Sequence, residues 1–292
     1  MPSHPATRRL PPWFKIRLTT GENSAKVQNL VSSNNLHTVC LSAACPNRME
    51  CWNAGTATFM ILGNVCTRRC GFCNVPKGTP SGTDAGEPQR VAAAVKALGL
   101  AYAVVTSVTR DDLPDGGASL FALTIRAIRN EAPDCRVEVL IPDFQGSESS
   151  LRTVLEEGPY VLNHNLETVP SLYPRVRPRA DYSRSIGLLE RAGKLGAITK
   201  SGIMLGLGER AGELTQVLKE LRETGCSILT LGQYLRPGKN NLPVERYYHP
   251  DEFLQLRDQA LSLGFLQVAS GPLVRSSYHA ERYFLDSVNR QR

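Results

Sequence analysis

Several features are missing from the sequence, and each absence removes a class of protein. No segment approaches the roughly 18 consecutive apolar residues that a membrane-spanning helix needs, and the start, MPSHPATRRL, lacks the apolar segment of a secretory signal. The 292 residues are 41% hydrophobic and 21% charged, without low-complexity segments, which is unlike a disordered or fibrous chain. We therefore expect a globular protein that is neither inserted into a membrane nor exported.

Cysteine is absent from most of the chain and concentrated in one part of it. Six of the 8 cysteines lie between residues 40 and 73, while Cys135 and Cys226 stand alone. Disulfide-dense chains are short, secreted and rich in cysteine throughout, so a disulfide scaffold is excluded. Clustered thiols in a reducing compartment indicate metal ligands instead, and the two isolated cysteines fit small buried apolar positions.

Acidic residues are fewer than basic ones. Lys and Arg number 34 against 27 for Asp and Glu, a net charge of +7. Part of the excess is local, because four arginines occur close together at positions 175, 177, 179 and 184. This charge is compatible with an acidic partner, with nucleic acid, or with a basic surface that only aids solubility.

From residue 58 onward, short apolar segments alternate with longer amphipathic ones, which is the pattern of βαβ units. We predict strands at residues 58–63, 102–108, 136–143, 160–167, 199–207 and 227–235. We predict helices at residues 87–100, 118–132, 149–158, 182–196, 213–225 and 250–265. Polar residues follow nearly every strand, and the carboxyl ends of barrel strands meet on one face. The pattern predicts an α/β fold, a partial (β/α)6 parallel barrel with one site on that face.

Three cysteines follow the first predicted strand in a C-x3-C-x2-C pattern, namely Cys66, Cys70 and Cys73. So short a loop can wrap a [4Fe-4S] cluster, and three thiolates leave one iron free to bind a small molecule. A buried helix stripe has the same spacing, but Arg68 and Arg69 interrupt it. A zinc site remains an alternative, although such sites more often show paired C-x2-C knuckles with a fourth ligand.

This loop, with an aromatic residue before its last cysteine, resembles that of the radical S-adenosylmethionine (SAM) enzymes. The resemblance implies that the open iron binds SAM and that reduction then yields a radical for C–H chemistry. Residues 163–168 (NHNLET) resemble the ribose-binding segment of biotin synthase, and residues 202–209 resemble the strand on the adenine side. By this resemblance the residues expected at SAM are Phe72, Thr106, Ser107, Asn165, Glu167, Arg179 and Met204.

A second triad, Cys40, Cys45 and Cys51, precedes the predicted barrel in a C-x4-C-x5-C pattern and implies a second metal centre. Together with residues 12–17, 109–117 and 271–280, it resembles lipoyl synthase over nearly the whole chain. In that family a serine of the Arg-Ser-Ser-Tyr segment is the fourth ligand of an auxiliary [4Fe-4S] cluster. The resemblance implies Ser277 as this ligand, with Ser276 as the alternative.

The resemblance also implies an activity, that of a sulfurtransferase. The auxiliary cluster would donate two sulfur atoms to C6 and C8 of an octanoyl chain on a carrier-protein lysine, with two [4Fe-4S] clusters and SAM as cofactors. The implied partners are the octanoylated lipoyl carrier, an electron donor such as ferredoxin or flavodoxin, and an iron–sulfur carrier that renews the cluster. No nucleic acid and no membrane is expected. About ten residues precede the first matching segment, too few for a mitochondrial presequence, so we expect a cytoplasmic enzyme.

This interpretation divides the chain into three parts, which are expected to form one compact unit. Residues 1–57 carry the auxiliary cysteines, 58–240 the radical SAM barrel, and 241–292 the serine ligand. The residues expected to carry catalysis are Cys66, Cys70, Cys73 and Ser277. Three alternatives remain: a biotin-synthase-like enzyme, which would lack the second triad, an RNA methylthiotransferase, for whose extra domain little chain is left, and a non-catalytic zinc-binding module.

Overall fold

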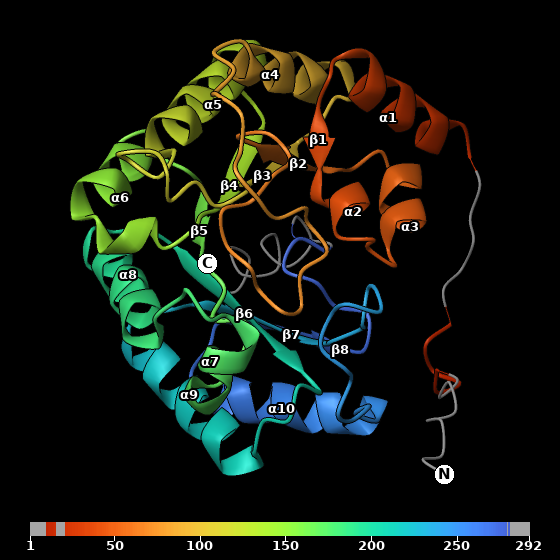
Figure 1. Ribbon diagram of the computed structural model, residues 1–292, viewed down its shortest axis with the longest axis vertical. Coiled ribbons are helices and arrows are strands. Elements are labelled where there is room, and N and C mark those ends of the chain that lie inside the picture. Colours follow the sequence, from red (N-terminus) through yellow and green to blue (C-terminus); the bar gives the residue numbers. More distant parts are fainter. Residues whose placement is uncertain (1–9, 16–20, 279, 281–292) are drawn as a thin grey trace.

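The computed structural model describes residues 10–15, 21–278 and 280. One eight-stranded sheet lies at the centre, with its strands in chain order from β1 to β8 and helices around the outside (Figure 1). Strand β1 (His37–Thr38) pairs antiparallel with β2, and every later pair of neighbours is parallel. Strands β1 and β8 are the two edges of the curved sheet, which makes the architecture a partial barrel.

The remaining elements follow the predicted alternation. The parallel strands are β2 (Thr58–Ile61), β3 (Tyr102–Ser107), β4 (Arg136–Leu140), β5 (Val161–Asn163), β6 (Thr199–Leu205), β7 (Ile228–Gln233) and β8 (Gln267–Gly271). The barrel helices are α4 (Glu87–Ala97), α5 (Ala118–Glu131), α6 (Glu148–Leu155), α7 (Tyr173–Val176), α8 (Tyr182–Lys194), α9 (Ala211–Glu223) and α10 (Pro250–Ser262). Short 3-10 turns occur at Phe144–Gly146 and Pro170–Leu172. Before the barrel lie α1 (Glu22–Ser33), α2 (Val39–Ser42) and α3 (Arg48–Asn53).

The six predicted strands and six predicted helices are confirmed, with boundaries that differ by a few residues. Strands β1 and β8 are additional. Strand β1 has only two residues, and β8 has the sequence QVASG, in which serine, alanine and glycine give little strand signal. Because β8 pairs with β7, the segment after residue 240 continues the sheet rather than only packing beside it.

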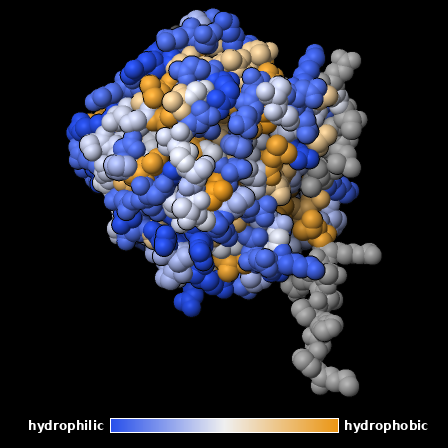
Figure 2. Space-filling view, turned by 45° about the horizontal axis from the view of Figure 1, so that its top comes forward, coloured by the Kyte–Doolittle hydropathy of each residue, from blue (hydrophilic) through white to orange (hydrophobic). Residues whose placement is uncertain are grey.

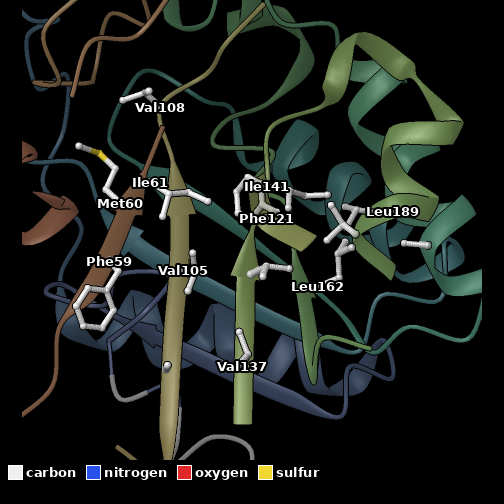
Figure 3. Packing of buried hydrophobic residues seen from close by; sticks show 14 of the residues in the cluster. Phe59, Met60, Ile61, Val105, Val108, Phe121, Val137, Ile141, Leu162 and Leu189 are labelled. Atoms are coloured by element: carbon white, nitrogen blue, oxygen red, sulfur yellow. The ribbon is translucent and has the colours of Figure 1, made fainter. Parts of the chain in front are cut away.

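The strands divide the interior into two environments, because successive side chains point to opposite faces of a sheet. On β3, Val105 joins the core between sheet and helices, whereas Val104 lines a cavity inside the barrel. Figure 3 shows part of the outer core, in which strand residues such as Val105 and Leu162 lie near Phe121 of α5 and Leu189 of α8. This core fixes the strands, and the strands carry the inward-facing site residues.

The face of the molecule in Figure 2 is mostly hydrophilic, with apolar residues in small groups. Within the described ranges, no helix has both the length and the apolar character needed to cross a membrane. Ile16 and Arg17 of the first matching segment, and His279 of the last, lie outside the described residues.

Candidate active site

The first cysteine triad lies in an irregular loop that leaves the carboxyl end of β2. The loop contains no helix between residues 62 and 86, which rules out the helix-stripe interpretation of the C-x3-C-x2-C spacing. Its start is held by Leu62, whose backbone N–H donates to the buried carboxylate of Glu87 at 2.7 Å. Gly117 makes room for this turn, since a Cβ there would lie 2.2 Å from a methyl of Leu62. The Asp-Gly-Gly motif at residues 115–117 therefore leaves room for the turn with which the loop begins.

Arg68 anchors the middle of this loop. Its guanidinium forms two hydrogen bonds of 2.8 Å to the carboxylate of Asp111, and further bonds of 3.0 and 2.5 Å to that of Asp143. Burial acts to raise the pKa of Asp143, but the bonds and charge of Arg68 outweigh it and lower that pKa to about 2. Paired Arg–carboxylate bonds are both strong and directional, so the loop is fixed to the ends of β3 and β4.

Backbone N–H groups of the loop also lie close to two of its thiol sulfurs. The amide of Arg68 lies 3.4 Å from Sγ of Cys66, and that of Val75 lies 3.5 Å from Sγ of Cys73. Burial raises the pKa of Cys70, and raises that of Cys73 to about 12. The metal-free thiols of Cys70 and Cys73 are therefore protonated at neutral pH, and iron would replace those protons.

The second triad sits on the short helices before the barrel. Cys40 is in α2, whose N-cap Thr38 accepts the amide of Leu41 at 3.4 Å, and Cys51 is in α3. Cys45 lies between them, with its N–H bonded to the carbonyl of Cys40 at 3.1 Å. Burial raises the pKa of Cys40, and raises that of Cys51 to about 12 with help from the other two thiols. The three sulfurs are thus close enough to interact electrostatically.

The C-terminal segment reaches both the N-terminal helices and the barrel. Asn47 donates to the carbonyl of Leu273 at 2.7 Å, which ties the segment to the second triad. Thr58 donates to Oγ of Ser277 at 2.9 Å, whereas Asn165 donates to Oγ of Ser276 at 2.7 Å. Ser277 therefore faces β2, beside the N-terminal triad, and Ser276 faces the segment after β5. This division favours Ser277 as the fourth ligand.

The two cysteine triads and the two serines face one cavity of about 770 Å3 inside the barrel. Its lining includes all six clustered cysteines, Ser276 and Ser277, and six of the seven residues expected at SAM: Phe72, Thr106, Ser107, Asn165, Glu167 and Met204. Within the described part of the chain, no three His, Cys, Asp or Glu side chains are grouped as they would be around a single metal ion. The ligands of a four-iron cluster bind different irons and so stand farther apart.

Four buried polar atoms of the cavity lining have no partner within the described residues: Oγ of Ser107, Nε2 of His164, Oδ1 of Asn165 and Nε of Arg177. Nδ1 of His164 lies 2.9 Å from the carbonyl of Ile141 and must donate to it, which leaves Nε2 as an acceptor. Burial, with the nearby charge of Arg177, lowers the pKa of His164 to about 4, so the ring is neutral. Such acceptors fit a ligand that carries hydroxyl and amino donors, as SAM does.

The segment after β5 is held in an unusual conformation. Glu167 has a φ of 67°, which is rare for a residue other than glycine, and its backbone pairs with β6 at Ile203. Burial raises the pKa of its carboxyl group, against the opposing charge of Arg177. At Gly202 a Cβ would lie 2.8 Å from Oδ1 of Asn165, so only glycine leaves this side of the cavity open. The site therefore has a built cradle beside the first triad.

The arginine run is arranged differently from the sequence expectation. Arg179 is exposed, bonds to the carbonyl of Thr67 at 3.2 Å, and is not among the cavity-lining residues. Arg177 lines the cavity instead, and its guanidinium donates hydrogen bonds of 2.9 Å to the backbone carbonyls of Asn165 and Leu166. Spacing alone gave no sign of which arginine turns inward. Because Arg177 is buried, the arginine run places less positive charge on the surface than its sequence indicates.

Comparison with known proteins decides the family. A sequence model of the radical SAM superfamily matches residues 60–230, and one for the N-terminal domain of lipoyl synthase matches residues 3–45. The chain is 55% identical to the lipoyl synthase of Rubrobacter xylanophilus, over 95% of this chain and 87% of the relative. It is 56% identical to that of Koribacter versatilis, over 96% and 92%. The chain belongs to the lipoyl synthase family.

Lipoyl synthases are radical SAM enzymes that use SAM and [4Fe-4S] clusters, and this chain is therefore a lipoyl-forming enzyme with those cofactors. The zinc-module, biotin-synthase and RNA-methylthiotransferase alternatives are thereby set aside. Solved structures support the fold. Methylornithine synthase has a TM-score of 0.53 at 15% identity, covering 94% of this chain and 92% of its own. SuiB of Streptococcus suis, bound to S-adenosylmethionine, has a TM-score of 0.56 at 10% identity, covering 74% and 51%.

Proposed function

We propose that this lipoyl synthase inserts sulfur at C6 and C8 of an octanoyl group attached to a carrier-protein lysine. One observation carries the proposal. Two separate cysteine triads, and a serine pair delivered from the far end of the chain, face the same buried cavity. One triad alone would suffice to generate a radical, so the second requires a different task, and the donation of sulfur is that task.

In this proposal Cys66, Cys70 and Cys73 hold the cluster that binds SAM. When bound, SAM and this cluster supply an organic radical able to remove hydrogen from an unactivated carbon. The protein itself orients SAM and the substrate and encloses them in the cavity. Asn165 and Glu167 stand where ribose hydroxyls are expected, and Arg177 fixes them by holding the backbone of their segment. The loop thiols are kept in place by Arg68.

Cys40, Cys45, Cys51 and Ser277 hold the auxiliary cluster in this proposal. A serine oxygen is a harder and poorer ligand for the irons of such a cluster than a thiolate. An iron held through Ser277 would therefore be the most weakly bound of the four and the easiest to release. Thr58 donates a hydrogen bond to Oγ of Ser277, which fixes that oxygen toward β2.

The partners follow from the chemistry. The octanoyl group must arrive on a lipoyl carrier, electrons on a donor such as ferredoxin or flavodoxin, and new iron and sulfide on an iron–sulfur carrier. Neither nucleic acid nor a membrane is needed. All eight cysteines are free, as in a reducing compartment such as the cytoplasm, where we place the enzyme. Residues 1–57, 58–240 and 241–292 act together as one unit, since each contributes to the cavity.

The proposal is tested with the reconstituted protein, SAM, a strong reductant and an octanoyl-lysyl peptide, kept free of oxygen. Mass spectrometry should find a peptide that has gained two sulfur atoms, as the dithiol, together with 5′-deoxyadenosine; the peptide should lose two hydrogens only when it is later oxidised to the disulfide. Cleavage of SAM without any sulfur in the peptide would contradict the proposed reaction.

A further inference from the structure

One group of buried side chains in the lining of the barrel cavity has no role in the proposed chemistry. Tyr102, Val104 and Ala280 pack against one another and all three line the cavity. Each is more than nine-tenths buried, with exposed fractions of 8%, 6% and 6%. Tyr102 and Val104 come from β3, and Ala280 comes from the C-terminal segment. We refer to these three residues as the end wall.

A buried ion pair supports the end wall from behind. The hydroxyl of Tyr102 donates to Oε2 of Glu138 at 2.8 Å, and Nζ of Lys200 bonds both oxygens of the same carboxylate at 2.8 and 3.1 Å. Asn163 adds a bond of 3.1 Å to Oε1. Glu138 and Lys200 are 1% and 2% exposed. The buried ion pair resists rearrangement because separating its charges is strongly unfavourable. The wall is therefore rigid.

The strand register places the wall deep in the barrel. Thr58, the partner of Ser277, is in register with Val104 on β3. Tyr102 lies two residues before Val104, or about 7 Å farther toward the amino end of the strand. The loop with Cys66 leaves from the opposite, carboxyl end of β2. The end wall thus lies at and just below the level of Thr58, the partner of Ser277, on the side of the sheet away from the loop that carries Cys66.

We propose that the end wall sets the length of the acyl chain that the enzyme accepts, an inference that rests on the proposed function. The acyl chain is attached through its carbonyl to a carrier protein, which is far too large for a cavity of about 770 Å3. The chain must therefore enter with its methyl end first. For the proposed reaction its C6 and C8 must lie near Ser277, and Val104 is at that level of the barrel. The side chains of Val104 and Ala280 offer the methyl end an apolar surface, and the ion pair behind them blocks further entry.

The end wall selects against acyl chains that are shorter than octanoyl and against chains that are longer. A chain that is too short leaves apolar surface of the cavity unfilled, and each missing methylene weakens binding by about fourfold. A chain that is too long must displace Tyr102 or Val104 against the network of Glu138. The wall thereby holds C6 and C8 of an octanoyl chain at one depth, near the level of Ser277.

The test measures binding rather than turnover. Dissociation constants of hexanoyl-, octanoyl- and decanoyl-lysyl peptides are determined by fluorescence anisotropy on the holoenzyme with SAM, without reductant so that no reaction occurs. Val104→Ala removes two carbons from the wall, so decanoyl peptide should bind at least as tightly as octanoyl peptide. Val104→Leu adds one carbon and should weaken octanoyl binding more than hexanoyl binding. The native protein should prefer octanoyl peptide to hexanoyl peptide by about fifteenfold, the value for two methylenes.

Val105→Ala is the matched control, since the same atoms are removed from the next residue of β3, which faces the outer core. It should leave the ratios among the three peptides unchanged. Val104 variants with native ratios would overturn the inference, as would a Val105→Ala variant that shifts the ratios equally. If the native protein bound octanoyl-lysyl peptide no better than acetyl-lysyl peptide, the proposed substrate itself would be wrong, and the wall would lose its role with it.

Discussion

Arg68 and Asp143 form a buried ion pair across 75 residues of chain, with two hydrogen bonds between their side chains. Their side chains are 4% and 0% exposed. One belongs to the loop of the first cysteine triad and the other follows β4, so the pair joins the cluster loop to the barrel. Asp111 completes the arrangement from the end of β3. The position of the first cysteine loop therefore depends on this buried pair of charges.

Arg68→Gln should destabilise the protein and loosen the first cluster. Removing one partner of a buried pair leaves an uncompensated charge on Asp143, at a cost of about 3–5 kcal/mol. Arg184→Gln is the control, because Arg184 also reaches Asp143, at 3.5 Å, but is 34% exposed and should cost less than about 1 kcal/mol. Thermal unfolding and iron content after gel filtration measure both effects. Equal behaviour of the two variants would show that the pair does not position the loop.

The two triads should be separable by single substitutions. Reconstituted native protein should hold about eight irons, and Cys70→Ala or Cys45→Ala should each lose about four. Cys45→Ala should still cleave SAM to 5′-deoxyadenosine but form no sulfurated product, whereas Cys70→Ala should do neither. Iron analysis and chromatography of the nucleoside products provide the measurements. Loss of all iron from either single variant would argue against two independent centres.

The two serines should differ in the direction that their hydrogen bonds indicate. Ser277→Ala removes the proposed fourth ligand and should lower both the retention of the auxiliary cluster and the sulfur insertion. Ser277→Cys should keep the cluster, since thiolate is a competent ligand, but should slow sulfur insertion because the iron is then released less readily. Ser276→Ala, which loses a contact with Asn165, should retain the auxiliary cluster. The opposite result for the two alanine variants would assign the ligand to Ser276.

His164 should make stability depend on pH. Its folded pKa of about 4 lies below the ordinary value of 6.5, so the unfolded chain binds more protons in this interval. The contribution of the neutral ring is complete above pH 6.5 and is lost as the pH falls toward 4, by about 3 kcal/mol in all. His164→Asn should flatten the fall of the unfolding temperature across this range. His249→Asn, at an exposed helix cap that asparagine also fills, should leave the native dependence intact.

The sequence was sufficient for the strands and helices of the barrel because their periodicity and length are strong. It was also sufficient to locate the cysteines and the serine segment, since each forms a compact motif. It could not reveal Arg68–Asp143 or Glu138–Lys200, because partners distant along the chain meet only through the strand order. Arg177 was missed in favour of Arg179 for a related reason. Both follow α7, and the turn of the backbone there, rather than the spacing, decides which one faces the cavity.

The central claim is that the site of Cys40, Cys45, Cys51 and Ser277 is the source of the inserted sulfur. The most direct measurement uses protein whose clusters are rebuilt with heavy-isotope sulfide, freed of excess sulfide and given octanoyl-lysyl peptide, SAM and reductant for one turnover. Mass spectrometry should find the heavy isotope in both sulfur positions of the product from native protein, and no sulfurated product from Cys45→Ala. Sulfur of normal isotope composition in the product, or labelled product from Cys45→Ala, would contradict the account.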